Sequence, residues 1–453
     1  MKERIVILGA GESGTGAALL ARQLGYEVFV SDAALVKPSY RDDLLRNKIE
    51  FEEGHHTEAK ILNAHCIIKS PGISETTPVV MKAKEKGIEV IDEIEFAFRF
   101  IKGRVVAITG TNGKTTTTLL TYHLFKSAGC DVALAGNVGE SLARKVAHGN
   151  HAWYVVEISS FQLDGTKLFR PDIGILLNIT PDHLDRYNYE MQNYINSKFR
   201  LAANMTPADA FIYYADDAVL KAEMMKRSVT GRILRISFTD NHAPLYFDGE
   251  WFHVNLEGHS FSLKQSDTTL RGNHNAVNTL AAMGAALTAG IKPEAIRVAL
   301  KTFKNAPHRL EHVATINGVE FINDSKATNV DSVVYALGSY RQPLVWIAGG
   351  IDKGNDYNLI KDEVQRKVKA LICLGKDNSK LKKFFTGVVP VIRETQSVQE
   401  LVRMAMKEAV AGDVVLLSPA CASFDLFKNY EDRGNQFKQA VLDLKKEMEH
   451  LSV

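Results

Sequence analysis

The sequence predicts an α/β protein of three domains, each built on a mainly parallel β-sheet. Apolar runs typical of strands alternate with helix-patterned segments along almost the whole chain, and this alternation favours parallel sheets. The 453 residues are too many for one hydrophobic core. Two glycine-rich loops, at residues 9–14 and 110–113, each follow an apolar run and precede a helix pattern. This arrangement indicates two nucleotide-binding units.

The composition is that of an ordinary globular protein, and it argues against several functional classes. A net charge of +2 disfavours a dedicated nucleic-acid-binding protein. No apolar run approaches the roughly 18 residues of a membrane span, and the chain enters its first strand so early that no signal peptide is expected. The four cysteines lack metal-site or C-x-x-C spacing, which predicts reduced thiols and a cytoplasmic protein.

The first predicted domain covers residues 1–93 and carries a dinucleotide-type fingerprint. The strand-like run "RIVILG" leads into Gly9-x-Gly11-x-x-Gly14, a helix pattern follows, and a second strand ends at Asp32, where a ribose-binding acid is expected. A third strand leads into the turn "SPG" at 70–72. The segment holds one Rossmann-like mononucleotide-binding half, whereas a dinucleotide site needs two. Its size therefore favours a smaller nucleotide over NAD.

The second predicted domain, residues 94–301, carries the stronger signal. "VVAITGTNGKTTTT" gives a strand, a glycine-rich turn and a helix start, which is the arrangement of a phosphate-binding P-loop. Lys114 is placed to reach terminal phosphates, and the Thr115 hydroxyl can hold Mg²⁺. The usual first glycine of the P-loop pattern would fall at position 108, which is Ile108, and the glycine stands at Gly110 instead.

Further strands of this domain are predicted at "DVALAGN", "WYVVE", "DIGILLN" and "FIYYADD". A polar, turn-rich stretch at 240–268 predicts a small β excursion, and residues 272–287 have a strong helical pattern. The stretch "KTFKNAPHRLEHV" resembles a linker into the third predicted domain, 302–453, which is Rossmann-like with strands at "PLVWIAGG", "ALICLG" and "DVVLLSPA".

Taken in order, seven motifs resemble those of the Mur ligase family, the ATP-dependent amide-forming enzymes of bacterial cell-wall precursor synthesis. The motifs are "TGTNGKTTT", "EISSFQL", "NITPDHLDRY", "GNHNAVN", "PHRLE", "NDSKATN" and "SPACASFDLFKNYEDRG". The last two are most similar to those of the members that add D-glutamate to UDP-N-acetylmuramoyl-L-alanine. The resemblance implies that the first domain binds UDP and that no nicotinamide is involved.

The metal and catalytic residues are expected around the P-loop. Glu157 ends an apolar strand, where a carboxylate can hold Mg²⁺. A lone histidine such as His183 is more often structural, but the resemblance implies that it is a ligand of a second Mg²⁺. By itself Lys198 is most simply a surface lysine whose aliphatic stem packs on the protein. The resemblance implies instead a lysine carbamylated by CO₂, and together with Lys114 and Thr115 these residues form the predicted catalytic and metal set.

Three further sets of site residues are predicted. Asn275 and Asn278 share one helix face and can bind an adenine edge, unless they are helix-cap or surface amides. The full ATP set is Gly110, Thr111, Asn112, Gly113, Lys114, Thr115, Thr116, Asn275, Asn278, His308, Arg309 and Asp324. The UDP-substrate set is Glu12, Ser13, Gly14, Asp32, Ser70, Pro71, Gly72, Asn137 and Ser159, in which Glu12 has the same charge sign as a diphosphate. The D-glutamate set is Lys326, Thr328, Lys353, Ser423, Phe424 and Tyr430.

The resemblance implies a ligase in which ATP phosphorylates the free carboxylate of UDP-N-acetylmuramoyl-L-alanine. The D-glutamate amine then attacks the acyl phosphate, and ADP and phosphate are released. ATP, about two Mg²⁺ ions and the Lys198 carbamate are the expected cofactors. The expected partners are these small molecules, with no nucleic acid or membrane, and the chain is expected to be a monomer. The alternatives are another amino-acid ligase of the family, such as an L-alanine-adding one, or an NAD-dependent oxidoreductase.

Overall fold

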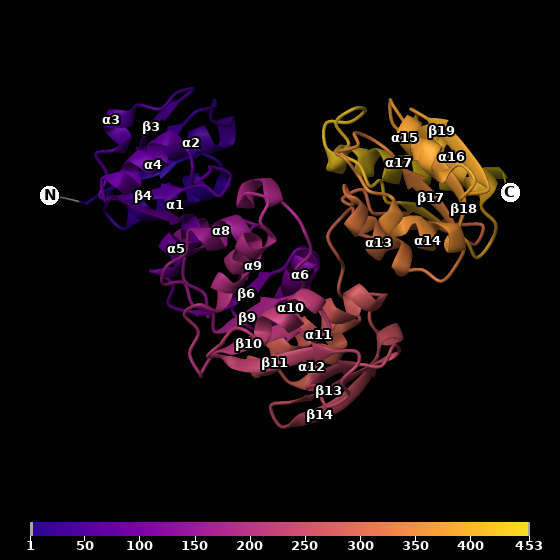
Figure 1. Ribbon diagram of the computed structural model, residues 1–453, viewed down its shortest axis with the longest axis horizontal. Coiled ribbons are helices and arrows are strands. Elements are labelled where there is room, and N and C mark those ends of the chain that lie inside the picture. The colour runs from indigo at the N-terminus through magenta and orange to yellow at the C-terminus, as the bar shows by residue number, and fades with distance from the viewer. Residues whose placement is uncertain (1–2, 452–453) are drawn as a thin grey trace. The chain divides into compact units, whose positions relative to one another are not determined.

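The computed structural model describes residues 3–451 and contains three β-sheets (Figure 1). The chain forms two compact units. The first comprises the residues up to 270 together with 275–303 and holds two of the sheets, and the second comprises 271–274 and 304–453 and holds the third. The α/β fold with three mainly parallel sheets is the one that the sequence predicts.

The N-terminal sheet is entirely parallel, with strand order β3-β2-β1-β4-β5. Its strands are β1 (Arg4–Leu8), β2 (Glu27–Asp32), β3 (Glu50–Glu53), β4 (Cys66–Lys69) and β5 (Glu89–Asp92). Its helices are α1 (Glu12–Gln23), α2 (Pro38–Arg46), α3 (Glu58–Ile61), α4 (Pro78–Glu85) and α5 (Glu93–Phe98). The strand order reverses at β1 and β4, so a binding crevice is expected beyond the carboxyl ends of these two strands. The short, charged β3 and β5 were not predicted from the sequence.

The glycines of the first loop are required by close backbone contacts. A Cβ on Gly14, in the first turn of α1, would lie 1.8 Å from the carbonyl oxygen of Gly9. Gly9 itself has a φ of +89°, which disfavours any residue with a side chain. The fingerprint therefore packs α1 tightly against the end of β1, as its sequence pattern predicts.

The central sheet has nine strands in the order β14-β13-β12-β11-β10-β9-β6-β8-β7. Its strands are β6 (Arg104–Thr109), β7 (Val132–Gly136), β8 (Trp153–Glu157), β9 (Ile173–Leu176), β10 (Ala210–Tyr214), β11 (Arg232–Ser237), β12 (Leu245–Phe247), β13 (Trp251–Leu256) and β14 (His259–Lys264). The predicted β excursion is confirmed: β12, β13 and β14 form an antiparallel meander that extends the parallel sheet from β11.

The helices of the central region follow the parallel strands and cover the sheet. They are α6 (Lys114–Ser127), α7 (Leu142–His148), α8 (Ser160–Asp164), η1 (Leu184–Tyr187), α9 (Met191–Phe199), η2 (Arg200–Ala202), α10 (Ala218–Met224), η3 (Gln265–Asp267), α11 (Asn273–Thr288) and α12 (Pro293–Leu300). The alanine-rich α11 is buried along almost its whole length, and it packs with α6 and the sheet in one hydrophobic core. This buried position explains why its pattern in the sequence is so apolar.

Buried carboxylates join the N-terminal sheet to the central region within the first unit. One oxygen of Glu95 accepts hydrogen bonds from the backbone N–H groups of residues 167–169, at 2.9–3.0 Å. Glu93 accepts a hydrogen bond from the backbone N–H of Ala143, in the first turn of α7. Burial raises the pKa of Glu93 well above its ordinary value, and that of Asp92 to about 7. The two regions are therefore connected by buried, hydrogen-bonded acids.

The C-terminal sheet has the order β15-β16-β20-β17-β18-β19. Its strands are β15 (Glu311–Ile316), β16 (Val319–Asn323), β17 (Leu344–Ala348), β18 (Val368–Leu374), β19 (Val391–Thr395) and β20 (Val414–Leu417), and its helices are α13 (Val330–Gly338), α14 (Asn358–Lys367), α15 (Ser379–Phe385), α16 (Val398–Glu408) and α17 (Tyr430–Leu451). All neighbours are parallel except β15 and β16. The expected linker is only partly a linker, because β15 begins within it and pairs with β16.

The helices and the cysteines bear on two predictions from the sequence, concerning membrane spans and free thiols. Helix α17 is the longest, with 22 residues, and it carries many charged side chains. Among residues 3–451, no helix combines the length and apolar character that crossing a membrane requires. The four cysteines are free thiols, as the sequence predicts, and Cys373 and Cys421 are buried.

Candidate active site

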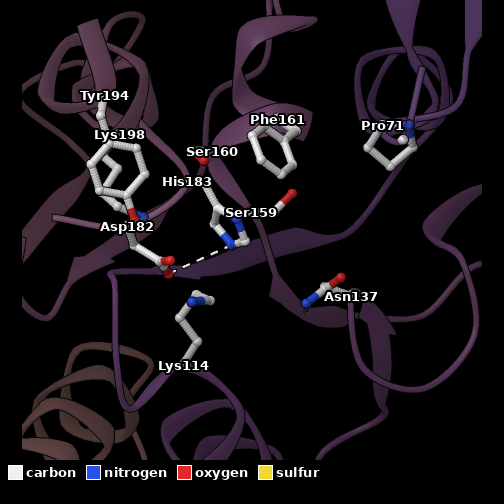
Figure 2. A pocket seen from close by; sticks show the side chains of 11 residues that line it. Pro71, Lys114, Asn137, Ser159, Ser160, Phe161, Asp182, His183, Tyr194 and Lys198 are labelled. Carbon is white, nitrogen blue, oxygen red and sulfur yellow. Dashed lines mark ion pairs between the residues drawn. The ribbon is translucent and has the colours of Figure 1, made fainter. Parts of the chain in front are cut away.

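A cavity of about 310 Å³ lies where the carboxyl ends of the central strands meet the turn that follows β4 (Figure 2). It is lined by Pro71, Gly72, Lys114, Asn137, Ser159, Ser160, Phe161, Asp182, His183, Tyr194 and Lys198. All of these residues belong to the first compact unit. The cavity therefore brings predicted ATP, metal and UDP-substrate residues to one place.

The glycine-rich loop between β6 and α6 forms the floor of this site. Gly113 has a φ of +86°, and a Cβ there would lie 2.4 Å from Oδ1 of Asn278. The loop begins at Gly110 because Ile108, where the usual first glycine would stand, is a fully buried residue of β6. The loop departs from the P-loop pattern because strand β6 continues for two more residues, through Thr109.

Lys114 and Thr115 open helix α6, so they stand at the positive end of the helix dipole. The Lys114 ammonium donates hydrogen bonds to the carbonyl oxygens of Gly110 and Thr111, at 2.9 and 2.8 Å. Thr115 and Thr116 are largely buried in the same turn. The cation therefore lies folded over its own loop, next to the cavity into which its side chain can reach.

The loop is held by side chains that sequence reasoning missed. Asn178, just beyond β9, exchanges two hydrogen bonds with the backbone of Asn112, at 2.8 and 3.0 Å. The hydroxyl of Thr111 lies 3.2 Å from the hydroxyl of Tyr194 and donates to the carbonyl oxygen of Thr180. The signal that could have found Asn178 is its place directly after an apolar strand, at the sheet edge where the loop lies.

Glu157 ends β8 with its carboxylate buried beside the cavity. It is 1% exposed, and its Oε1 accepts a hydrogen bond from Nδ2 of Asn137 at 2.9 Å. Its Oε2 has no hydrogen-bond partner among residues 3–451. A buried carboxylate oxygen without a partner is costly unless something binds it. A hard cation such as Mg²⁺ fits this oxygen.

His183 and Asp182 also line the cavity, with their side chains next to each other (Figure 2). Nε2 of His183 is 3.5 Å from a carboxylate oxygen of Asp182, and the imidazole is 5.2 Å from the ring of Phe161. His183 has a φ of +52°, and about half of its side chain is exposed. The exposed half of the imidazole is accessible to a ligand, and a metal-binding role for His183 stays a prediction.

Lys198 is not the surface lysine that its sequence pattern alone allows. It lies on α9, is 1% exposed, and its ammonium donates to the carbonyl oxygen of Gly110 at 2.8 Å. The same nitrogen lies 4.6 Å from the centre of the Tyr194 ring. Burial, and secondly the nearby charge of Lys114, hold the pKa of Lys198 well below its ordinary value. The environment therefore favours a neutral amine at the phosphate loop.

Asn275 and Asn278 lie one turn apart on α11 and are both buried, so the alternative of surface amides is wrong. Nδ2 of Asn278 donates to Oδ1 of Asn275 at 3.1 Å. Oδ1 of Asn278 accepts a hydrogen bond from the hydroxyl of Thr117, at 3.1 Å. The pair therefore connects α11 to α6 directly beneath the glycine-rich loop.

The predicted UDP residues divide into three groups. Pro71, Gly72, Asn137 and Ser159 line the cavity, and Ser159 also caps α8 with Gln162. Ser13 and Gly14 lie in the first turn of α1. Asp32, Ser70 and Glu12, in contrast, contact the protein itself. Both oxygens of Asp32 accept backbone hydrogen bonds, from Ala10 at 2.6 Å and Ala34 at 2.8 Å, and the Ser70 hydroxyl lies 3.5 Å from the carbonyl oxygen of Gly9.

The carboxylate of Glu12 binds the start of α7. Its Oε1 accepts hydrogen bonds from the backbone N–H of Ser141 and from Nε of Arg144, both at 2.9 Å. Arg144 also donates to Asp43 of α2, at 2.8 Å. The like charge that is unexpected beside a diphosphate is therefore neutralised by a buried arginine of the central region.

His308, Arg309 and Asp324 lie in the second compact unit. His308 is buried with a φ of +64°, and its Nδ1 is 3.0 Å from Nδ2 of Asn323. Asp324 accepts hydrogen bonds from the Leu310 backbone at 3.2 Å and the Ser418 hydroxyl at 3.0 Å. Burial raises the pKa of Asp324 to about 7.

The predicted D-glutamate residues lie on the loops that follow β16, β17 and β20, except Tyr430, which begins α17. These strands are neighbours in one parallel sheet, so the loops lie at its carboxyl edge. Ser423 is buried, Thr328 and Tyr430 are half-buried, and Lys353 and Phe424 are exposed, Phe424 to 66%. The Lys326 ammonium lies 5.2 Å from the centre of the Tyr430 ring.

Arg433, on α17, connects these three loops and was missed from the sequence. Its guanidinium donates to the carbonyl oxygens of Ser325, Gly349 and Cys421, at 2.9, 3.3 and 3.2 Å, and to the Ser325 hydroxyl at 2.9 Å. Burial lowers the pKa of Arg433 to about 10. An arginine inside a helix pattern gives no sign of burial in the sequence, so only the fold identifies it.

The protein has no preformed cluster of metal ligands: residues 3–451 contain no group of three or more histidine, cysteine or acidic side chains that could hold a metal ion. Single donors from separate elements lie at or beside the cavity instead. His183 lines it, Glu157 binds the lining residue Asn137, and Thr115 follows the lining residue Lys114 at the start of α6. Such a site fits a cation that completes its coordination with phosphate oxygens and water.

Comparisons with known proteins agree along the chain. Residues 3–92 match the Mur ligase MurD-like N-terminal domain, 108–286 the Mur ligase middle domain, and 308–421 the Mur ligase glutamate ligase domain. A UDP-N-acetylmuramoylalanine--D-glutamate ligase of Cytophaga hutchinsonii is 49% identical over 98% of this chain and 100% of its own. A ligase of the same name from Porphyromonas gingivalis is 51% identical over 98% of this chain and 99% of its own.

Solved structures show the same fold. The UDP-N-acetylmuramate-alanine ligase MurC of Thermotoga maritima superposes with a TM-score of 0.62, at 16% identity, over 98% of this chain and 100% of that one. A pseudomurein peptide ligase of Methanothermus fervidus gives 0.61 at 20% identity, over 98% and 100%. With three family domains matched in order and about half of the residues identical to full-length relatives, the chain belongs to the Mur ligase family.

Proposed function

We propose that this protein is an ATP-dependent ligase that adds D-glutamate to UDP-N-acetylmuramoyl-L-alanine in the synthesis of peptidoglycan precursors. The observation that carries the proposal is that Lys114 of the phosphate loop and the Pro71–Gly72 turn of the N-terminal sheet line the same cavity. A nucleotide-linked acid bound at that turn would place its carboxylate near the phosphate loop. The names of the relatives with about 50% identity support the choice of D-glutamate.

The reaction needs activation, because a carboxylate is a poor electrophile. ATP supplies the phosphoryl group that converts the substrate carboxylate into an acyl phosphate, and Mg²⁺, when bound, offsets the charge of the phosphates. Lys114 would leave the carbonyl oxygens of its own loop and follow the charge on the transferred group. The D-glutamate amine then forms the amide bond, and phosphate and ADP leave.

We assign the metal ligands to Thr115, Glu157, His183 and a carbamate on Lys198. The partnerless Oε2 of Glu157 supports the first site. Carbamylation requires an uncharged amine, and the lowered pKa of Lys198 supplies one. It also converts a buried amine, beside Lys114, into an anion that can bind metal. The nitrogen that now donates to Gly110 would then carry a carboxylate.

The carbamate has a test that does not depend on turnover. Protein equilibrated with ¹³C-labelled CO₂ should show one protected carbamate carbon signal by NMR, absent from Lys198→Ala. Lys198→Ala and Lys198→Arg should both be nearly inactive, since arginine keeps the charge but forms no stable carbamate. A short carboxylic acid in solution should partly restore Lys198→Ala. Full activity of Lys198→Arg, or of enzyme in CO₂-free buffer, would refute the carbamate.

The remaining roles follow the predicted sets. We assign ATP to the loop 110–116 with Asn275 and Asn278, and the UDP-linked substrate to the residues that line the cavity beside the 71–72 turn. We assign D-glutamate to the loops after β16, β17 and β20 that Arg433 connects. His308, Arg309 and Asp324 are proposed to complete the ATP site. The domain division 1–93, 94–301 and 302–453 and a monomeric state belong to the same proposal.

Phosphate release from ATP tests the proposed function directly. With UDP-N-acetylmuramoyl-L-alanine present, release should require D-glutamate and should not occur with L-glutamate or L-alanine. Calorimetry should show binding of the UDP-linked substrate and none of NADH. Turnover of UDP-N-acetylmuramate with L-alanine would instead identify the protein as an L-alanine-adding ligase, and NADH binding without UDP-substrate binding would exclude a ligase.

A further inference from the structure

Arg186 connects the two walls of the cavity and has no role in the assignments above. It lies on η1, three residues after His183, and its guanidinium lies 4.5 Å from the centre of the Phe161 ring. Its two terminal nitrogens each lie 3.4 Å from a carbonyl oxygen, one from that of Gly72 and the other from that of Pro71. The residues it touches, Pro71, Gly72 and Phe161, all line the cavity.

We infer that Arg186 is a positioning residue for the nucleotide-linked substrate. Its guanidinium holds the Pro71–Gly72 turn of the N-terminal sheet against Phe161 of the central region, and it thereby sets the width of the cavity between them. The inference rests on the proposed function, because it assumes that the substrate bridges this turn and the phosphate loop.

The shape of the side chain suits this role. A planar guanidinium can stack on a ring and donate two hydrogen bonds to neighbouring carbonyl oxygens at once, which a lysine ammonium cannot. The turn itself is ordered by hydrogen bonds from the Ser70 backbone to Leu8 and from Ile73 back to Ser70, at 2.9 and 3.0 Å. Arg186 is the contact that connects this ordered turn to the loop bearing His183.

The charge of Arg186 also remains available to an anionic substrate. Its two contacts with the turn are to neutral carbonyl groups at the long end of hydrogen-bond distance, and within residues 3–451 it forms no ion pair with a carboxylate. The nearby cation Lys69 is already bound, by the carbonyl oxygen of Ile73 at 2.8 Å and by Glu75 at 3.1 Å. The glycine loop at 9–14 contributes Glu12 and no cation. Arg186 is thus well placed to favour a diphosphate beside the turn.

Steady-state kinetics and calorimetry on the full-length protein test the inference. Arg186→Ala should weaken binding of UDP-N-acetylmuramoyl-L-alanine about tenfold, seen as a higher Kd and KM. The KM for ATP and the kcat should each stay within about threefold, because the phosphate loop is untouched. Arg186→Lys keeps the charge without the planar fork, so it should recover less than half of the loss.

Arg297→Ala is the matched control. Its guanidinium also stacks on a phenylalanine, Phe261, at 4.8 Å, but on elements that do not line the cavity. All of its kinetic constants should stay within about twofold of the wild type. The inference is overturned if Arg186→Ala binds the UDP-linked substrate normally, if its KM for ATP rises equally, or if Arg186→Lys recovers fully. Failure of the wild type to turn over D-glutamate would refute the proposed function instead.

Discussion

Two strand–loop–helix units of this protein share one local architecture and carry opposite charges. In both, a glycine with a left-handed backbone lies in the loop, at Gly9 and Gly113, and a helix follows the loop. The first helix begins with Glu12 and the second with Lys114. Glu12 points to Ser141 and Arg144 and joins two regions of the chain. Lys114 lines the cavity.

The difference shows that a glycine-rich loop by itself specifies a backbone shape. Exposed backbone N–H groups at a helix start can receive an anion in either loop. The charged residue at the start of the helix, and the tertiary partner it meets, decide whether the loop serves chemistry or the joining of domains. Four substitutions test this distinction.

Lys114→Ala should produce the largest effect. It removes the cation that we propose follows the charge on the transferred phosphoryl group, so kcat should fall about 10²–10³-fold. The circular dichroism spectrum and melting temperature should stay those of the wild type. Lys126→Ala, at the exposed end of the same helix, is the control and should keep full activity. Near-normal turnover of Lys114→Ala would mean that the charged residue of the second loop, like that of the first, takes no part in the reaction.

Gly14→Ala tests whether the first loop is specified by packing. Its Cβ would overlap the carbonyl oxygen of Gly9, so the protein should lose about 3 kcal/mol or more of stability. Gly11→Ala is the control in the same loop, because a Cβ there meets nothing within 4 Å, and it should cost less than about 1 kcal/mol. Equal melting temperatures for the two variants would contradict the close approach of α1 to β1.

Glu12→Ala tests the joining role of the first helix. It leaves the buried Arg144 with only Asp43 as a charged partner, and we expect a loss of about 2 kcal/mol in the free energy of unfolding. The free energy of UDP-substrate binding should change by less than the free energy of unfolding does. Glu27→Ala removes an exposed carboxylate paired with Arg4 in the same domain and should cost under about 1 kcal/mol. A strengthened UDP affinity in Glu12→Ala would show that Glu12 faces the diphosphate.

Asp92→Asn should give the smallest effect, a change in how the melting temperature depends on pH. Asp92 lies at the same junction, between the N-terminal sheet and the central region. The pKa of Asp92 is raised to about 7 in the folded protein, so its proton stabilises the fold fully below the ordinary pKa near 3.8. That contribution is lost as the pH rises through 7, and the wild-type melting temperature should fall between pH 5 and 8. The slope should be shallower in Asp92→Asn, while exposed Asp377→Asn should leave it unchanged. Equal slopes in Asp92→Asn and the wild type would contradict the raised pKa.

The sequence by itself determined the α/β class, most of the parallel strands and the phosphate loop. It could do so because buried parallel strands such as β6 and β17 are continuous apolar runs, and because glycines at 110 and 113 followed by Lys114 have few other physical uses. The short charged strands β3 and β5 escaped prediction, since backbone pairing with neighbours, and not composition, makes them strands.

Only the tertiary structure decided how the predicted side chains are used. It buried Lys198 against Gly110 and lowered its pKa, turned Glu12 to Arg144, and left one oxygen of Glu157 without a partner. It also introduced Arg186 and Arg433, whose hydrogen bonds run to loops distant in the sequence. The physical reason is that burial and long-range hydrogen bonds depend on which segments the fold brings together. A local sequence pattern does not specify which distant segments will contact it.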